Sequence, residues 1–386
     1  MIPKSECEQR IHGLRTRLSK DGIDGALLVH GVDLYYYTGT RQNALLWVPA
    51  DGAPVLMVRK SFTRAAQESA VSDVRPLTSS KEILPTLGNA QKIGVTFDVL
   101  PTHLFHFYSG LLPGREFVDI SGINRELRSV KSGWELEKLR MSGRKLCEVF
   151  SQIPSFLSPG MREIDISAEV EYRLRKAGTP GLLRMRAFNQ EVVGIAAGES
   201  AAISGCFDGP VTGKGVSAAT PFGSSLEVIR ENVPIMVDYG ALFDGYLVDM
   251  TRTFVIGTLP EELQKAFDLA LDIEAWLIEN MRPGRICEDL YVGALRLAES
   301  AGLGEYFMGY PGEQAKFVGH GVGLELDELP VLSPRFKYPL HEGNVVAIEP
   351  KFIFPGVGIV GIENTYAVGK GGCEKFTGLP DDLVHV

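Results

Sequence analysis

Two aspartates in one apolar stretch are the first residues of this sequence that could do chemistry together. Asp238 and Asp249 lie in VPIMVDYGALFDGYLVDMTRTFVIG. The Asp244-Gly245 pair between its two apolar runs predicts a hairpin, because both residues tolerate the positive φ of a two-residue turn. That turn places Asp238 opposite Thr251 and makes Asp249 its diagonal neighbour, about 7–8 Å away between backbones. Two buried carboxylates call for a neutralising cation, although a solvated sheet face stays open on these residues alone.

Three further segments add an imidazole and two more carboxylates. His320 lies between glycines in FVGHGVGLELDELP, which lets its backbone approach a ligand, although a lone histidine is more often a packed or surface residue. Glu349 ends the apolar strand of VVAIEPK, and Glu363 has apolar neighbours in GIVGIENTYAV. A three-residue turn at Pro355–Val357 would set Glu349 directly opposite Glu363. An edge position or a buried salt bridge is the alternative for such carboxylates.

These residues together suit two divalent metal ions with mixed oxygen and nitrogen coordination. The predicted ligands are Asp238, Asp249, His320, Glu349 and Glu363. Manganese, cobalt, zinc and iron all accept such a set, and four carboxylates roughly neutralise two divalent cations. Two ions about 3.5–4 Å apart can generate a hydroxide at neutral pH and polarise a carbonyl, which is the chemistry of amide hydrolysis.

The elements that must position these residues fall into two parts, and the first predicts an α/β domain over residues 1–128. Helical spacing covers Glu6–Lys20 and Phe62–Ser69, and a buried-strand pattern covers Ala26–Val29. DLYYYTGTRQNALLWVPADGAPVLMVRK gives three more strand-like runs, of which the tyrosine-rich run comes first. Strands that alternate with helices are typical of an α/β fold.

The second part, residues 129–386, predicts an α+β domain. A capping-box pattern, Ser132 followed by Glu135, opens a helix that should extend from Trp134 to about Leu157. Short strands make up most of the remainder. Further helices are predicted at Ile164–Ala177, Pro260–Met281 and Cys287–Ala301.

Composition narrows the class of protein. The 386 residues are 45% hydrophobic with a mean hydropathy of +0.04, which allows a large core and more than one domain. A net charge of −9 argues against nucleic acid or an anionic membrane as the main partner. Five scattered cysteines without a CxxC pair indicate a reducing compartment and no structural zinc. With no signal-peptide pattern and no apolar run of about 18 residues, we expect a soluble, cytoplasmic protein.

The metal-site segments resemble those of the pita-bread metallopeptidases, which include Xaa-Pro aminopeptidases, prolidases and methionine aminopeptidases. The matching segments are VDYGALFDGYLVDMTRTF, GHGVGLELDELP, IEP and IENT, and the junction RSVKSGWELEKLR resembles the prolidase and creatinase branch. The resemblance implies a catalytic domain of two similar α/β units around a curved antiparallel sheet. It also implies a homodimer, and cleavage of an amino-terminal peptide bond next to proline by a metal-bridged hydroxide.

The resemblance also implies a role for each ligand. Asp249 and Glu363 would bridge the two metals. Asp238 would complete one ion, and His320 and Glu349 the other. Glu349 would also be the candidate general base, so Glu349 and His320 are the expected catalytic residues.

Three departures from the family pattern surround these ligands. The peptidases usually carry a second histidine where this chain has Asp327, a Pro-His histidine where it has Phe222, and an arginine where it has Gly361. Loss of one stabilising donor typically costs about 10²–10³ in rate. Asp327 and Phe222 are therefore the candidate substrate-binding residues. Asp327 would bind a substrate amino group, or it is an exposed acid in the run Glu325–Glu328.

Because of these departures, two alternatives to a peptidase stay open. One is a metalloenzyme of the same fold that acts on a non-peptide small molecule. The other is a non-catalytic binding protein. A creatinase-like activity is less favoured, because that branch lacks the metal ligands that this chain keeps.

Overall fold

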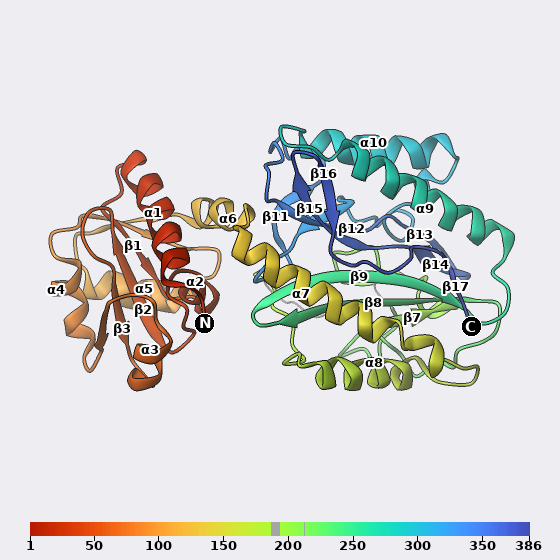
Figure 1. Cartoon of the computed structure of the whole chain (residues 1–386), viewed down its shortest axis with the longest axis horizontal. Helices are drawn as coiled ribbons and strands as arrows, with labels where there is room; N and C mark the ends of the chain where they lie inside the picture. Colours follow the sequence, from red (N-terminus) through yellow and green to blue (C-terminus); the bar gives the residue numbers. More distant parts are fainter. Residues whose placement is uncertain (187–193, 212) are drawn as a thin grey trace. The chain divides into compact units, whose positions relative to one another are not determined.

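The computed structural model describes residues 1–186, 194–211 and 213–386. The chain divides into two compact units, Met1–Arg128 and Ser129–Val386 (Figure 1). Each unit buries a hydrophobic core of its own. Among the described helices, none combines the length and the apolar character that a membrane crossing requires.

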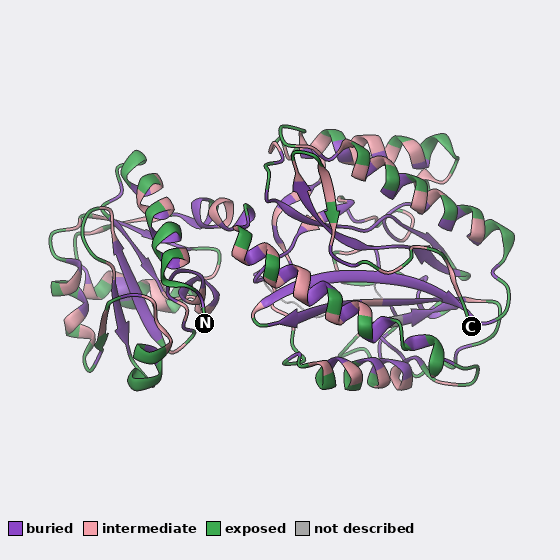
Figure 2. Cartoon of the chain, in the orientation of Figure 1, coloured by how far each residue is buried: buried purple, intermediate pink, exposed green. Residues whose placement is uncertain are grey.

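The first unit is built on a six-stranded mixed sheet with the strand order β4-β3-β2-β1-β5-β6. Its central strands are buried on both faces (Figure 2). The strands are β1 (Gly25–Leu28), β2 (Ala44–Pro49), β3 (Val55–Val58), β4 (Asp73–Pro76), β5 (Lys92–Val95) and β6 (Glu116–Asp119). The helices are α1 (Lys4–Lys20), α2 (Gly31–Thr38), α3 (Phe62–Glu68), α4 (Ile83–Leu87), α5 (Thr102–Leu111) and α6 (Ser121–Ser129).

The prediction of a strand at the tyrosine-rich run was wrong, because this run forms the helix α2. The helix ends at Gly39, whose φ of 83° suits a left-handed C-cap. Its side chains are buried almost all round, Tyr36 and Tyr37 included. A helix with no polar face shows no helical period, so its sequence cannot be told from that of a buried strand.

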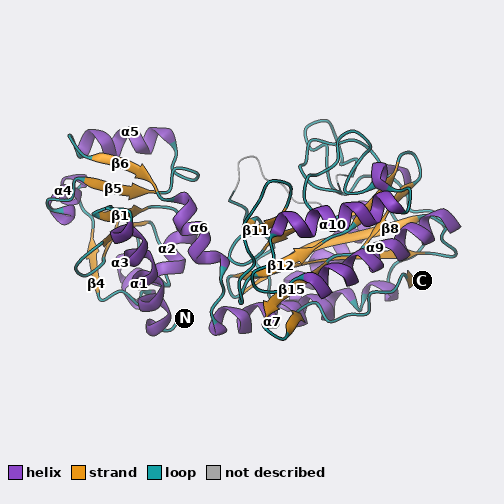
Figure 3. Cartoon of the chain, turned by 90° about the horizontal axis from the view of Figure 1, so that it is seen from above, coloured by secondary structure: helices purple, strands orange, loops and turns teal. Residues whose placement is uncertain are grey.

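In the second unit two helix pairs flank the strands (Figures 1 and 3). The helices are α7 (Gly133–Phe150), α8 (Glu163–Ala177), α9 (Glu261–Asn280) and α10 (Cys287–Ser300). One sheet has the order β17-β9-β8-β7, a second β11-β10-β12-β15-β16, and β13 and β14 form a separate pair. These strands are β7 (Ile195–Ala197), β8 (Pro234–Phe243), β9 (Tyr246–Val255), β10 (Gly319–Gly321), β11 (Glu328–Leu332), β12 (Val345–Ile348), β13 (Lys351–Phe354), β14 (Gly358–Gly361), β15 (Asn364–Gly369), β16 (Gly372–Lys375) and β17 (Val384–His385).

The capping box of α7 is present as predicted, but the helix is shorter than expected. Ser132 Oγ accepts a hydrogen bond from the Glu135 N–H, and the Glu135 carboxylate accepts one from the Ser132 N–H. The helix ends at Phe150 and a short 3₁₀ turn follows over Ile153–Ser155. Pro154 lies in that turn. It has no N–H to donate within a helix, and its ring clashes with the preceding turn, so the α-helix cannot continue through it.

The β8–β9 hairpin has the predicted turn and the predicted register. Asp244 and Gly245 have φ values of 48° and 94°, as a two-residue turn of this kind requires. Asp238 pairs with Thr251, and Gly240 pairs with Asp249. Both aspartates therefore lie on one face of the hairpin, two positions apart along β8.

A second, longer hairpin is interrupted in its middle. Ile348 pairs with Asn364 between β12 and β15, and Lys351 pairs with Gly361 between β13 and β14. Both ladders have the same register, so Glu349 and Glu363 lie opposite each other at the interruption, as predicted. An isolated bridge between Thr251 and Glu363 joins this hairpin to β9.

Behind this hairpin, α9 carries a buried carboxyl group. The Asn364 side-chain amide and the Tyr366 hydroxyl donate to Glu274 Oε1 over 2.8 and 3.1 Å. Burial, with the nearby Asp381 charge, raises the pKa of Glu274 to about 7 from its ordinary 4.5. The folded state therefore binds a proton that the unfolded state releases.

We predict that the native protein loses free energy of unfolding between acid and neutral pH because of Glu274. Replacing Glu274 by glutamine should remove this loss. The contribution of the protonated Glu274 is complete below pH 4.5 and is lost as pH rises through about 7. The variant should therefore gain on the order of 1–3 kcal/mol over the native chain at pH 8, and almost nothing at pH 4.5. Urea unfolding of both proteins across this pH range measures the difference, and parallel curves would contradict the prediction.

Candidate metal centre

The two hairpins and β10 bring the five predicted ligands into one neighbourhood. His320 Nε2 lies 3.4 Å from Glu349 Oε1 and 3.7 Å from Glu363 Oε1. Ligand atoms of Asp249, His320 and Glu363 all lie within 4.8 Å of one another. Asp238 joins the group through a cation that it shares with Glu349 and Glu363, the ammonium of Lys351.

The ring of His320 is oriented by the backbone behind it. Its Nδ1 lies 2.8 Å from the carbonyl oxygen of Leu326. A neutral imidazole that donates from Nδ1 keeps its lone pair on Nε2, which faces the carboxylates. The flanking glycines allow the neighbouring strands to approach closely. A Cβ at Gly319 would lie 2.6 Å from Ala347 O, and one at Gly321 would lie 2.3 Å from Leu329 O.

The loop that carries Leu326 is itself held by a buried ion pair. Lys131 Nζ lies 3.0 Å from Glu328 Oε2, with both side chains almost wholly buried. The other carboxylate oxygen of Glu328 accepts the N–H groups of Leu324 and Glu325. Lys131 and Glu328 therefore position the carbonyl group that orients His320.

Crowding of the carboxylates shifts their protonation. Burial, followed by the charges of Glu363 and Asp238, raises the pKa of Asp249 well above its ordinary value. Burial also raises the pKa of Asp238 to about 6, although Lys351 opposes this shift. Burial alone would lower the pKa of His320, but its contacts with Glu349 and Glu363 raise it well above the usual range. Burial therefore favours the protonated form of the two aspartates, and the neighbouring carboxylates favour it in all three groups.

Lys351 is the site residue that sequence reasoning missed. Its ammonium lies 2.8 Å from Glu349 Oε2, 3.0 Å from Asp238 Oδ2 and 3.1 Å from Glu363 Oε2. The signal was present in VVAIEPK, because residues two apart on an extended chain share a face. Burial alone would lower the pKa of Lys351, but these three carboxylates raise it well above its ordinary value.

The donor set fits a divalent cation. Glu363 Oε1 is buried and has no hydrogen-bond partner among the residues that the structure describes. It lies in the same cluster as Asp249 and His320. An unpaired buried carboxylate oxygen beside an imidazole nitrogen is a mixed oxygen and nitrogen site of the kind that transition metals prefer.

The two candidate substrate residues lie near the metal ligands but not among them. Asp327 is half-buried, and its Oδ1 accepts the N–H of Arg186 over 2.6 Å. Phe222 lines a pocket of about 330 Å³ together with Gly240. A Cβ at Gly240 would lie 3.5 Å from Asp249 Oδ1, so this pocket borders the predicted ligands.

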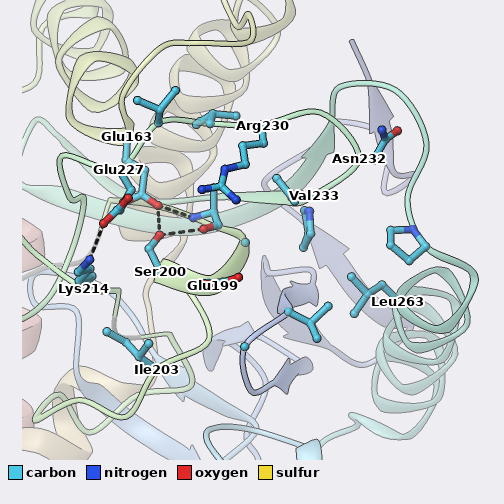
Figure 4. Close-up of a pocket in the computed structure, with 18 residues that line it drawn as sticks. Glu163, Glu199, Ser200, Ile203, Lys214, Glu227, Arg230, Asn232, Val233 and Leu263 are labelled. Carbon is cyan, nitrogen blue, oxygen red and sulfur yellow. Dashed lines mark hydrogen bonds and ion pairs between the residues drawn. The ribbon is translucent and has the colours of Figure 1, made fainter.

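A larger pocket of about 500 Å³ lies at the start of β8 (Figure 4). None of the five predicted ligands lines it. Its buried carboxylate, Glu163, accepts the N–H groups of Ala197 and Ser225 over 2.7 Å each, and also the Ser200 hydroxyl. Glu163 therefore holds the surrounding loops together through these hydrogen bonds, which indicates a structural role.

Comparison with known proteins settles the family. The model of metallopeptidase family M24 matches residues 137–370, and that of the creatinase/prolidase N-terminal domain matches residues 10–130. The chain belongs to metallopeptidase family M24. Its second unit is therefore a pita-bread metallopeptidase domain and its first a creatinase/prolidase-type N-terminal domain, which confirms the predicted fold class.

Similar proteins match over almost the whole chain. An Xaa-Pro dipeptidase of Pyrococcus furiosus is 26% identical over 98% of this chain and 100% of its own length. A probable dipeptidase, PepE, of Mycobacterium tuberculosis is 27% identical over 95% of this chain and 92% of its own. The solved Xaa-Pro dipeptidase from Bacillus anthracis is 25% identical with a TM-score of 0.85, over 98% of this chain and 100% of that chain.

Family membership confirms a metal-dependent hydrolase and implies divalent metal ions. The two alternatives, a non-peptide metalloenzyme and a non-catalytic binding protein, are not favoured by these relatives. The number of ions and their identity stay predictions.

We predict that replacing Lys131 by methionine destabilises the second unit by about 3–5 kcal/mol, because Glu328 would keep a buried charge without its cation. The double variant, with Glu328→Gln as well, should recover most of that loss. Chemical denaturation of the metal-free single and double variants measures the coupling, and additive losses would show that the pair is not coupled.

Proposed function

We propose that this protein is a metal-dependent dipeptidase or aminopeptidase that cleaves the amino-terminal peptide bond of Xaa-Pro substrates. The cluster of Asp249, His320 and Glu363 in a family M24 domain carries the proposal. The names of the relatives, Xaa-Pro dipeptidase among them, support the choice of substrate.

The proposed chemistry divides between the bound metal and the side chains. Divalent ions in this cluster would lower the pKa of water and polarise the scissile carbonyl group. Glu349 would accept the proton of the attacking water, which is the role that the family resemblance implies, and Lys351 would hold its Oε2 in place. Manganese, cobalt, zinc or iron would serve, and the five predicted ligands would hold up to two ions.

Substrate contacts are proposed for Phe222 and Asp327. The pocket that Phe222 lines has apolar side chains, including Leu183 and Val216, beside polar ones such as Glu171 and Arg175, and it borders Asp249. An apolar substrate side chain would fit there. Asp327, whose Oδ1 accepts the Arg186 N–H, would receive the substrate amino group.

We also propose that the enzyme is a cytoplasmic homodimer. Five free cysteines are compatible with a reducing compartment, and dimers are what the family resemblance implies. Light scattering on the purified protein measures the assembly state.

We predict that the metal-loaded protein hydrolyses Ala-Pro faster than Ala-Ala, and that a chelator abolishes the activity. Replacing Glu349 by glutamine should lower kcat by about 10²–10⁴-fold, because the general base is lost. Steady-state kinetics with metal content measured on the same samples separates loss of the base from loss of the ion. A metal-loaded native enzyme that leaves a panel of Xaa-Pro peptides intact would refute the proposed activity.

We predict that replacing Phe222 by alanine raises KM for substrates with a bulky apolar amino-terminal residue by roughly tenfold, about 1.4 kcal/mol of lost contact. kcat and metal content should change little, because Phe222 does not contact the ligands. Gly-Pro, which has no side chain to fill the pocket, is the control substrate. An equal rise in KM for Gly-Pro would place Phe222 outside the side-chain pocket.

A further inference from the structure

The ammonium of Lys351 lies among carboxylates that would otherwise need a bound cation to neutralise them. It has three carboxylate oxygens within hydrogen-bond distance, from Asp238, Glu349 and Glu363. A lysine ammonium has three N–H donors, so these contacts satisfy it completely. Two of these carboxylates, those of Asp238 and Glu363, would also hold one of the two metal ions that the family resemblance implies.

The lysine is also fixed in place. Its side chain is 1% exposed, and its stem lies against Gly361, where an added Cβ would come within 2.7 Å of both Cα and Cγ of Lys351. An ammonium that left the three carboxylates would become a buried, unpaired charge, which is strongly unfavourable. The Lys351 ammonium therefore does not yield its position readily to a second cation.

The remaining donors gather on the other side of the cluster. His320 Nε2, Glu349 Oε1 and Glu363 Oε1 face one another, and Asp249 lies within reach of the same point. A second divalent ion on Asp238 would have to share the carboxylates of Asp238 and Glu363 with the Lys351 ammonium, which lies 3.0 and 3.1 Å from one oxygen of each. Two positive charges that share carboxylates lie close together and repel strongly in a buried site.

We infer that this chain holds a single divalent ion, ligated by Asp249, His320, Glu349 and Glu363, and that the Lys351 ammonium takes the place of a second ion beside Asp238. The inference rests on the metal-dependent function proposed above. It also explains Gly361, which stands where the peptidases carry an arginine. The stem of Lys351 fills that space, so the cluster receives its monovalent positive charge from the facing strand.

The first test counts ions in the native full-length protein. The protein is stripped with a chelator, reloaded with Mn²⁺, freed of excess metal and analysed by elemental mass spectrometry. We expect about one ion per chain and the electron paramagnetic resonance spectrum of isolated Mn²⁺. About two ions per chain with an exchange-coupled spectrum would overturn the inference.

Two matched aspartate variants test which carboxylate holds the ion. Asp238→Asn should retain Mn²⁺ with less than about tenfold weaker binding, because Asp238 pairs with Lys351. Asp249→Asn should weaken binding by more than about 100-fold, beyond the 10–100-fold typical of residues outside the ligand sphere. Equal losses in the two variants would overturn the assignment.

Lys351→Ala tests the lysine itself, with circular dichroism and thermal unfolding as the check on folding. Removal of the ammonium should raise the count from about one to about two ions per chain. The surface variant Lys370→Ala, whose native side chain is 82% exposed, should leave the count unchanged. A folded Lys351→Ala protein that still holds about one ion would overturn the inference, and the native count and the aspartate pair decide it if this variant does not fold.

The outcome is separable from that of the proposed function. One ion per chain without cleavage of any Xaa-Pro peptide would refute the peptidase and leave the ion count standing. Cleavage by a protein with two ions per chain would support the peptidase and refute the inference of a single ion.

Discussion

The second unit depends on one electrostatic constraint, the gathering of four carboxylates on the facing surfaces of two hairpins. Each hairpin contributes two, and neither pair can be buried without a positive partner. The ammonium of Lys351 meets part of that need within the chain. A divalent ion would supply the remaining positive charge. Burial and the neighbouring carboxylates meanwhile raise the pKa values of Asp238 and Asp249.

Polar groups behind the carboxylates keep the two hairpins in register. Thr251 donates its hydroxyl to Glu363 Oε2, and the hydroxyl of Thr365 both accepts from the backbone N–H and donates to the backbone carbonyl of Asp249. From the opposite face of β9, the buried guanidinium of Arg252 donates to the carbonyl oxygens of Thr251 and Glu363. These hydrogen bonds hold the backbone that carries the carboxylates in place without the help of a bound ligand.

Local patterns in the sequence were sufficient to predict the strand pairings that bring the candidate ligands together. The Asp244-Gly245 turn set the pairing of β8 with β9, and the turn at Pro355–Val357 set that of β13 with β14. Such patterns act over a few residues, so they failed where tertiary packing decides, as at the fully buried helix α2. Lys351 was missed for a different reason. Its spacing of two residues from Glu349 indicated the shared face, but a lysine after Glu-Pro carries no sign of burial, and only its contacts with Asp238 and Glu363 make it part of the site.

The continuous register of the interrupted hairpin restricts the length of the chain far from the ligands. Glu349 and Glu363 are opposite each other because the eleven-residue segment from Lys351 to Gly361 closes on itself with one fixed offset. Since side chains alternate across a strand, one residue added to or removed from that hairpin would turn one glutamate away from the other. Loop tips ordinarily tolerate insertions. Here the exposed turn at Pro355–Val357 is a loop tip at which a change of length would disturb the site.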